Sequence, residues 1–131
     1  MSIAEMIADH PQVQNEDAAL GQAVRHAMYC AAIANSCADA DSAEDGDMRQ
    51  CIRACSDCSD ICTATYRTAS RRTAGNVQLI MSMFELCIQA CERCAEECEK
   101  HDNPHCKRCA TMCRETIEDC RKALAVMKKG S

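Results

Sequence analysis

The chain has 131 residues, a formal charge of −5 at pH 7 and only 2% aromatic residues. This length predicts a single domain, 1–131, that is large enough to bury its own core. The acidic balance and the lack of stacking aromatics argue against nucleic-acid binding, which usually needs a basic stripe. No apolar stretch is long enough to span a bilayer and no secretory signal is visible, so we expect a cytoplasmic protein with reduced thiols.

Cysteine is heavily over-represented, with 14 residues in the chain. In a short secreted protein this content would indicate a disulfide scaffold rich in loops and turns. Only four glycines and two prolines are present, however, and alanine, glutamate and arginine are common. The composition therefore favours helices over a loop-rich scaffold.

The first part of the chain predicts a short helix followed by a long one. Residues 2–8 form a short amphipathic segment that ends before Pro11, because the residue preceding a proline avoids helical geometry. Asn15 is the expected N-cap of a long helix over about 16–40, since its side chain can accept a backbone hydrogen bond. The acidic stretch 41–47 is expected to form a solvated turn.

Three further helices are expected in the rest of the chain. One covers about 46–74, with Gly75 at its C′ position, and the next covers about 77–101. Pro104, which follows an asparagine N-cap, begins the last helix over about 104–129. Four long helices with short connections predict an all-α fold: an antiparallel up-down-up-down four-helix bundle with a short N-terminal helix.

The cysteines recur at helical spacing within these segments. In the second and third long helices they step by four, three and four residues, and in the fourth by three, four and seven. Residues three or four apart share one face of a helix, so each series forms a stripe of thiols where a core would normally be. The cysteines are Cys30, Cys37, Cys51, Cys55, Cys58, Cys62, Cys87, Cys91, Cys94, Cys98, Cys106, Cys109, Cys113 and Cys120.

Two interpretations without metal explain these stripes poorly. Leucine or isoleucine would bury more apolar area, so an ordinary core has little use for so many cysteines. Cβ atoms three or four residues apart on a helix are separated by about 5–6 Å, whereas a disulfide needs about 3.5–4.5 Å. Disulfides within one stripe would be strained, although bridges between helices leave a disulfide-stabilised interaction bundle as an alternative.

Metal binding fits the spacing better. A cation that bridges two thiolates holds the sulfurs about 4.6 Å apart, which helical neighbours can reach. Thiolates select Cu(I), zinc and iron–sulfur clusters, and Cu(I) accepts the low coordination that paired thiolates offer. One Cu(I) per thiolate would also leave the core neutral, so about fourteen or more ions could bind. A zinc- or iron–sulfur-binding regulatory or electron-transfer module remains the alternative, and no catalytic motif predicts an enzyme.

The predicted topology brings the end of the third long helix and the start of the fourth to one pole. We expect His101 and His105, near Cys106, to capture copper at this mouth. Met48 lies three residues before the first cysteine of its helix, and a thioether ligand and a core residue explain it equally well. His26 lies four residues before Cys30, towards the other pole, and is interpreted as mainly structural.

The repeated CxxxCxxCxxxC pattern, together with His101 and His105 beside Cys106, resembles the bacterial copper storage proteins, a family of cysteine-rich four-helix bundles. The resemblance covers residues 15–129. It implies that all the cysteines hold Cu(I) ions that enter at one polar end, and that the chain belongs to a cytosolic branch of homotetramers. On this basis we predict a copper storage protein for sequestration, detoxification or supply, which exchanges copper with a copper chaperone or a small thiol.

Overall fold

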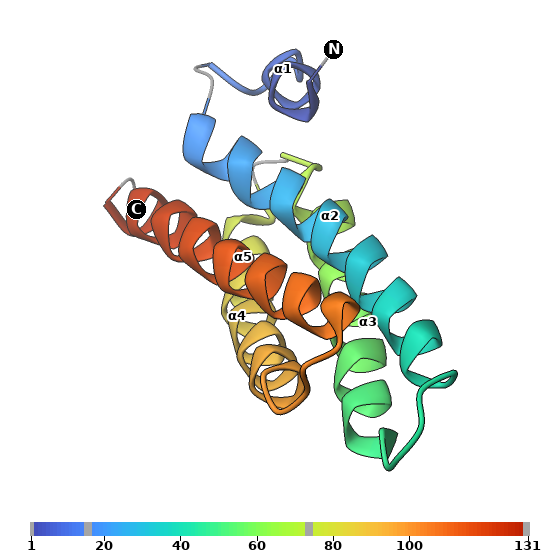
Figure 1. Ribbon diagram of the computed structural model, residues 1–131. Helices are drawn as coiled ribbons and strands as arrows, with labels where there is room; N and C mark the ends of the chain where they lie inside the picture. The colour runs from blue at the N-terminus through green and yellow to red at the C-terminus, as the bar shows by residue number, and fades with distance from the viewer. Residues whose placement is uncertain (1, 15–16, 73–74, 130–131) are drawn as a thin grey trace.

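The computed structural model describes residues 2–14, 17–72 and 75–129. Within these ranges it contains five helices and no strand, which confirms the predicted all-α fold. Figure 1 shows four long helices packed into a bundle, with the short helix α1 lying across one end. The helices are α1 (Ile3–Ala8), α2 (Ala18–Asp41), α3 (Arg49–Ala69), α4 (Val77–Cys98) and α5 (Pro104–Lys129).

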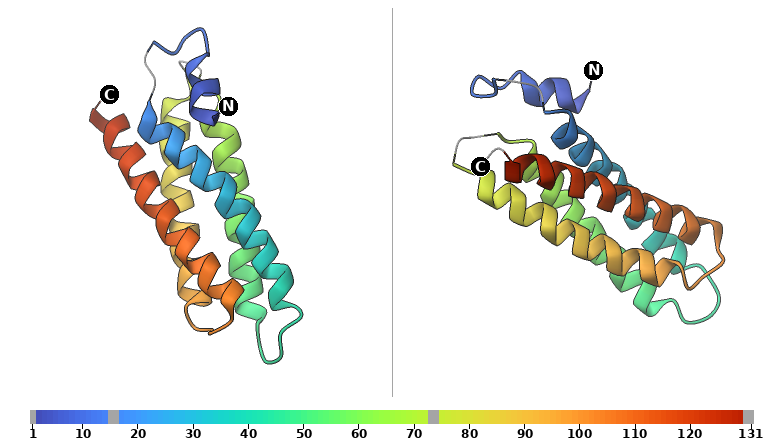
Figure 2. Two further views of the ribbon diagram at one scale, coloured as in Figure 1. Left: turned by 45° about the horizontal axis from the view of Figure 1, so that its top comes forward. Right: turned by 90° about the vertical axis from the view of Figure 1, so that its left-hand side faces the viewer.

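Each long helix packs against two others in a ring, because α2 contacts α3 and α5 while α4 contacts the same two helices. The chain runs up and down through the bundle, so the α2–α3 and α4–α5 connections lie at the same end (Figure 2). We call this end the mouth. The two chain termini and α1 lie at the opposite end.

The core is built from small side chains on α2 and thiols on the other helices. Besides Cys30 and Cys37, α2 buries a row of alanines, whereas α3, α4 and α5 bury the cysteine stripes predicted from their spacing. Small side chains let α2 approach the sulfur atoms of its neighbours closely. The end opposite the mouth is filled by larger apolar groups, and Leu20, Ile80 and Phe84 are fully buried there.

Several helix ends differ from the sequence expectation. Asp17 is the N-cap of α2 and accepts a hydrogen bond of 2.9 Å from the Leu20 N–H, whereas the expected cap Asn15 lies outside the described residues. Helix α3 ends at Ala69 rather than at 74, so Gly75 is not its C′ residue. Ala69 is the last buried residue of α3, and its C-cap Ser70 donates its backbone N–H to the carbonyl oxygen of Tyr66.

Helix α4 also ends earlier than expected, at Cys98 rather than at 101. Glu99 is its C-cap and donates its backbone N–H to the carbonyl oxygens of the last turn. His101 therefore lies in the α4–α5 turn and does not continue the thiol stripe of α4.

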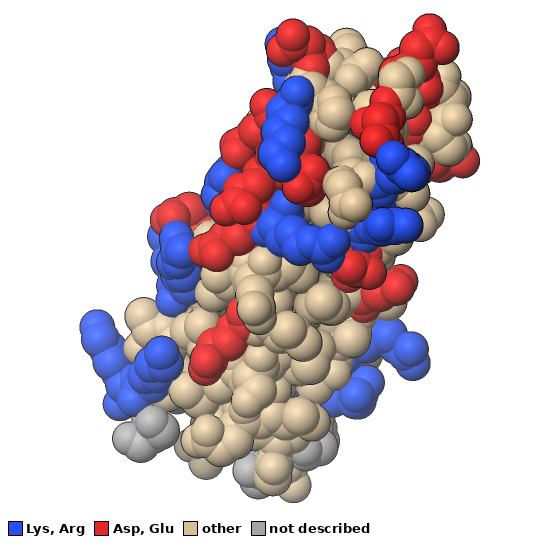
Figure 3. All heavy atoms as spheres, turned by 90° about the horizontal axis from the view of Figure 1, so that it is seen from below, with Lys and Arg blue, Asp and Glu red and all other residues tan. Residues whose placement is uncertain are grey.

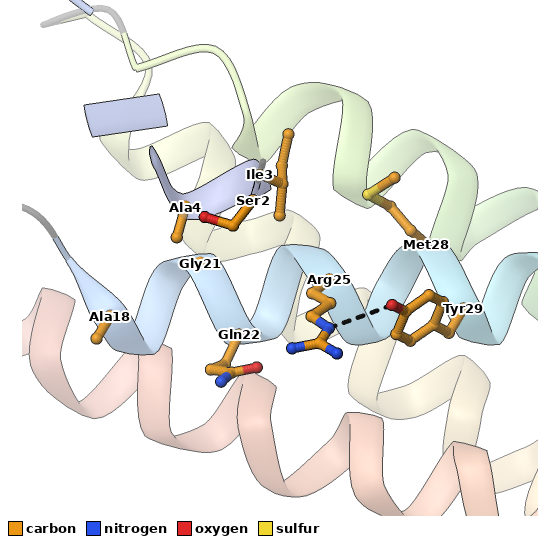
Figure 4. A pocket seen from close by; sticks show the side chains of 9 residues that line it. All are labelled: Ser2, Ile3, Ala4, Ala18, Gly21, Gln22, Arg25, Met28 and Tyr29. Carbon is orange, nitrogen blue, oxygen red and sulfur yellow. Dashed lines mark hydrogen bonds between the residues drawn. The ribbon is translucent and has the colours of Figure 1, made fainter. Parts of the chain in front are cut away.

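Helix α1 rests on α2 through a close backbone approach. A Cβ atom added at Gly21 would lie 2.6 Å from Cβ of Ala4, so only glycine fits beneath α1 at this point (Figure 4). Beside the contact lies a hollow of about 470 Å³, in whose wall Arg25 Nε donates a hydrogen bond of 3.3 Å to the Tyr29 hydroxyl. None of the described residues that line this hollow is a cysteine or histidine, so it is separate from the thiol core.

Charged side chains of both signs cover the outside of the bundle. Figure 3 shows acidic and basic groups interleaved over the upper half of this view, whereas the centre of the lower half is mostly uncharged and basic groups lie at its edges. Ion pairs join adjacent helices, such as Arg93 with Asp57 at 2.7 Å and Arg121 with Glu92 at 2.9 Å. Among the described helices, none is long and apolar enough to cross a membrane.

Candidate metal centre

All fourteen cysteines are free and buried, and each is at most 2% exposed. Neighbouring Sγ atoms lie 3.6–4.0 Å apart, mostly between different helices, as for Cys55 and Cys98 at 3.6 Å. These separations are far longer than a disulfide bond of about 2.05 Å. The interior of the bundle is therefore a continuous column of thiols in van der Waals contact.

One group of four thiols lies midway along this column. Its members are Cys30 of α2, Cys58 and Cys62 of α3, and Cys91 of α4, and all four Sγ atoms lie within 4.8 Å of one another. Five of the six pairs are separated by 3.8–3.9 Å. This arrangement is nearly tetrahedral and could hold one ion or several bridged ions.

A second group of four thiols lies nearer the mouth and takes one cysteine from each long helix: Cys37, Cys55, Cys98 and Cys109. Cys94 connects this group to the deeper one, because it lies 3.7 Å from Cys109 and belongs to a three-thiol group with Cys58 and Cys113. At the deep end of the column, the Sγ atoms of Cys62 and Cys87 are 3.7 Å apart.

At the mouth, nitrogen and oxygen atoms join the sulfurs. Cys37, Asp41, His105 and Cys106 place one ligand atom each within 4.8 Å of the others. The Nδ1 atom of His105 lies 3.3 Å from Sγ of Cys37 and 3.6 Å from Sγ of Cys106. His105 is 26% exposed, whereas the other three side chains are buried, so His105 connects solvent to the thiol column.

A hydrogen bond on the far side of the ring fixes the orientation of His105. Its Nε2 atom lies 2.8 Å from Oε2 of Glu44, and the side-chain amide of Asn103 donates to the same oxygen. Because an ionised carboxylate only accepts hydrogen bonds, Nε2 carries a proton, and in the neutral ring Nδ1 then presents its lone pair to the thiols. Metal-ligating histidines are commonly oriented in this way by a carboxylate on the second nitrogen.

Asp41 is the most unusual charged residue of the protein. It is 1% exposed, its Oδ1 lies 3.4 Å from Sγ of Cys106, and its Oδ2 has no hydrogen-bond partner among the described residues. Burial raises the pKa of Asp41 above its ordinary value. A buried carboxylate with an unpaired oxygen is costly, and a cation in the mouth would compensate it.

The surroundings of Asp41 also affect the nearby thiols. Burial, followed by the hydrogen bond and the negative charge of Asp41, raises the pKa of Cys51 to about 12. Burial and the charge of Cys37 raise the pKa of Cys106 as well. The hydrogen bond with Cys37 raises the pKa of His105, although burial opposes the shift. Without metal, the mouth thiols Cys51 and Cys106 are thus protonated at neutral pH.

The structure places the remaining predicted residues differently. His101 is not among the residues that cluster at the mouth; it lines an outer hollow of about 440 Å³ with Asp102 and Lys107. Met48 is 6% exposed and directly precedes α3, which is compatible with a core residue and with a ligand. Asp41 and Glu44 were not identified from the sequence as residues of the site. The position of Asp41, four residues after Cys37, indicated that it shares the inward face of its helix.

Known proteins with this arrangement bind copper. The copper storage protein Ccsp of Streptomyces lividans, loaded with 10 copper equivalents, is 29% identical and superposes with a TM-score of 0.88 over 95% of this chain and 98% of that one. A histidine-to-alanine variant of Ccsp is 33% identical, with a TM-score of 0.80 over 83% and 94% of the two chains. The cytosolic copper storage protein of the same organism, loaded with five coppers, is 33% identical, with a TM-score of 0.78 over 82% and 92%.

Sequence comparison gives the same result. The uncharacterized cysteine-rich protein YhjQ of Bacillus subtilis (strain 168) is 35% identical over 75 residues, which are 57% of this chain. The match spans 66% of YhjQ, just under two thirds of its length. A family model described as copper storage protein matches residues 16–125, which include the four long helices almost entirely. The chain therefore belongs to the copper storage protein family.

Proposed function

We propose that this protein stores Cu(I) in the cytosol by binding many ions to the thiolates of its core. The observation that carries the proposal is the column of fourteen buried thiols, which reaches a partly exposed histidine and a buried carboxylate at the mouth. Two related structures of Streptomyces lividans copper storage proteins hold ten and five coppers, and one of these proteins is described as cytosolic.

Storage in such a core depends on charge balance. A buried thiolate is unfavourable unless a cation neutralises it, and one Cu(I) for each thiolate gives a neutral interior. Every Cu(I) that binds replaces a thiol proton, so loading releases protons to solvent. Thiolate ligands also select Cu(I) over hard cations such as Mg²⁺ and Ca²⁺.

Loading changes the separations between the sulfur atoms only slightly. An ion that bridges two sulfurs at about 2.3 Å in a linear arrangement holds them about 4.6 Å apart. The observed 3.6–4.0 Å is shorter, so the sulfurs separate by about 0.6–1.0 Å, or the ions take three sulfurs about 4.0 Å apart. Small rotamer changes of cysteine side chains can supply this movement.

Copper enters, in this proposal, past His105. Its Nδ1 atom faces Cys37 and Cys106, and Asp41 supplies a negative charge behind them. An incoming ion can therefore exchange its carrier ligands for nitrogen, sulfur and oxygen atoms before it reaches the four-thiol groups. His101 lies outside this cluster, and we propose that it contacts copper carriers before His105 does.

An anaerobic titration with Cu(I), in competition with a chromophoric chelator, tests the storage function. We expect at least about one tightly bound copper for each cysteine, because all fourteen thiols are buried in the core of the bundle. Saturation after one to four ions would contradict bulk storage and would favour a sensor or a copper chaperone.

One observation favours zinc as a second candidate. Four sulfurs around a tetrahedral zinc ion at about 2.3 Å lie about 3.8 Å apart, which matches the group formed by Cys30, Cys58, Cys62 and Cys91. A zinc-binding module would keep a small number of zinc ions when Cu(I) is added. A storage protein for copper would lose any bound zinc as Cu(I) replaces it, which metal analysis after desalting distinguishes.

The family is one of storage proteins, and we propose that this chain catalyses no reaction. We further propose that a copper chaperone or a small thiol delivers and removes the copper, and that the chain assembles into a homotetramer. Sedimentation equilibrium of the apo and loaded protein tests the assembly, and a monomer in both states would contradict it.

A further inference from the structure

We propose that the protein has a second metal site of a different kind, for a divalent cation of the zinc class, on the outside of the bundle. The site lies at the junction of α2 and α5, where His26 and Glu115 supply the ligand atoms and Asp119 positions the histidine. These residues lie outside the thiol column and outside the mouth.

The ring of His26 is held by its Nδ1 atom. Nδ1 makes a short contact with the Asp119 carboxylate and lies 3.2 Å from the main-chain oxygen of Gln22. Both neighbours are hydrogen-bond acceptors, so Nδ1 carries a proton, and in the neutral ring Nε2 keeps its lone pair. This is the carboxylate–histidine arrangement that orients histidine ligands in metal proteins.

The free nitrogen faces a second carboxylate at a separation that suits a metal ion. Nε2 of His26 lies 3.8 Å from Oε2 of Glu115, which is too long for a hydrogen bond. With bond lengths of about 2.0–2.2 Å, a zinc ion between a nitrogen and an oxygen separates them by about 3.4 Å at the tetrahedral angle and about 4.2 Å when they are opposite. The observed separation lies within this range.

The environment is both held in place and accessible. The side chains of His26 and Asp119 are 23% and 17% exposed, whereas Glu115 is 54% exposed, so solvent can complete the coordination of the ion. A hollow of about 380 Å³ opens beside the histidine, and Lys122 lines it. Two carboxylates against one ammonium leave a net negative charge around the site, which favours a cation.

The donor set distinguishes this site from the core. Imidazole and carboxylate ligands suit zinc and similar divalent ions, whereas the thiol column selects Cu(I). A bound ion would join α2 to α5 directly, since His26 belongs to one helix and Glu115 to the other. An ion that binds only the folded state stabilises it by mass action. The bound ion therefore cross-links α2 and α5, and its binding does not depend on the thiols.

Zinc binding to the Cu(I)-saturated protein tests this inference, because copper then occupies the competing thiols. Equilibrium dialysis against zinc under anaerobic conditions, followed by metal analysis, should show one more zinc per chain in the wild type than in Glu115→Gln or His26→Gln. Asp119→Asn should weaken zinc binding by about 10–100-fold, because it removes a partner that orients the ligand. Thermal unfolding should show that zinc raises the Tm of the wild type but not that of Glu115→Gln.

Glu118→Gln is the matched control, since Glu118 is a neighbouring glutamate on α5 that is 65% exposed and faces Arg121. This variant should retain the extra zinc. Equal zinc content in the wild type and Glu115→Gln, or equal loss in Glu118→Gln, would overturn the proposal. The wild type and Glu115→Gln have the same cysteines, so the difference in their zinc content can also be measured without copper. A failure of this zinc site can therefore be distinguished from a failure of copper storage.

Discussion

Glu44 should control the rate of copper uptake without contributing a ligand. It accepts the Nε2–H of His105 at 2.8 Å and so directs Nδ1 towards Cys37 and Cys106. In Glu44→Gln the amide can rotate and present either its oxygen or its NH₂ group, so the ring loses its fixed tautomer and orientation. Loss of such a partner typically weakens metal binding at the histidine by about 10–100-fold, or about 1.4–2.7 kcal/mol.

Uptake can be followed by stopped-flow mixing of the apo protein with a coloured Cu(I)–chelator complex. We expect Glu44→Gln to slow the first phase by about 10–100-fold and to leave the total copper capacity unchanged, because every cysteine remains. Asp45→Asn is the matched control, since it removes one negative charge from the same α2–α3 connection without contacting His105. If both variants slow uptake equally, general electrostatic attraction explains the rate and the positioning role of Glu44 is wrong.

Three further predictions concern stability and pH. Folding raises the pKa of the Asp41 carboxyl, so as the pH rises the unfolded chain loses the Asp41 proton before the folded protein does, and the free energy of unfolding falls. Asp41→Asn should therefore stabilise the apo protein by about 1–3 kcal/mol at neutral pH and by less in acid, as measured by urea unfolding. The affinity for Cu(I) should fall by up to about tenfold for each unit by which the pH decreases, because every Cu(I) displaces a thiol proton, for example from Cys51 with its pKa of about 12. A chelator competition in which the affinity does not depend on pH would contradict this prediction. Phe84→Ala should destabilise the apo protein by about 3–5 kcal/mol in urea unfolding while the copper capacity stays the same, since Phe84 is fully buried at the end away from the mouth.

The thiol stripes could be predicted from the sequence because they depend on local geometry alone. Residues three and four apart share a helix face in any helix, so the spacing of Cys51, Cys55, Cys58 and Cys62 predicted one inward row, and all four are buried. The end of α4 was less predictable. Lys100 and His101 are compatible with a helix, but the chain leaves α4 after Cys98 to reach α5, and this removes His101 from the stripe.

The residues of the mouth needed contacts between distant parts of the chain. Glu44 and His105 are separated by 61 residues, and Asp41 and Cys106 by 65. An acidic turn in the sequence is normally solvated, and the only local sign that Asp41 is buried is its position four residues after Cys37, on the same helix face. The same holds for His26, whose sequence position indicated a structural residue and whose cross-helix carboxylates suggest a metal ligand.

The sequence by itself determined the chemistry of this protein: thiols at helical spacing, on helices whose other residues cannot build an ordinary core, require a soft metal. Only the tertiary structure decided how the thiols meet, because sulfur–sulfur contacts of 3.6–4.0 Å arise mostly between helices. It also brought His105 into one cluster with Cys37, Cys106 and the buried Asp41, whereas His101 lies outside that cluster. Spacing along one helix fixes which face a side chain occupies, whereas its ligand partners depend on the packing of all four helices.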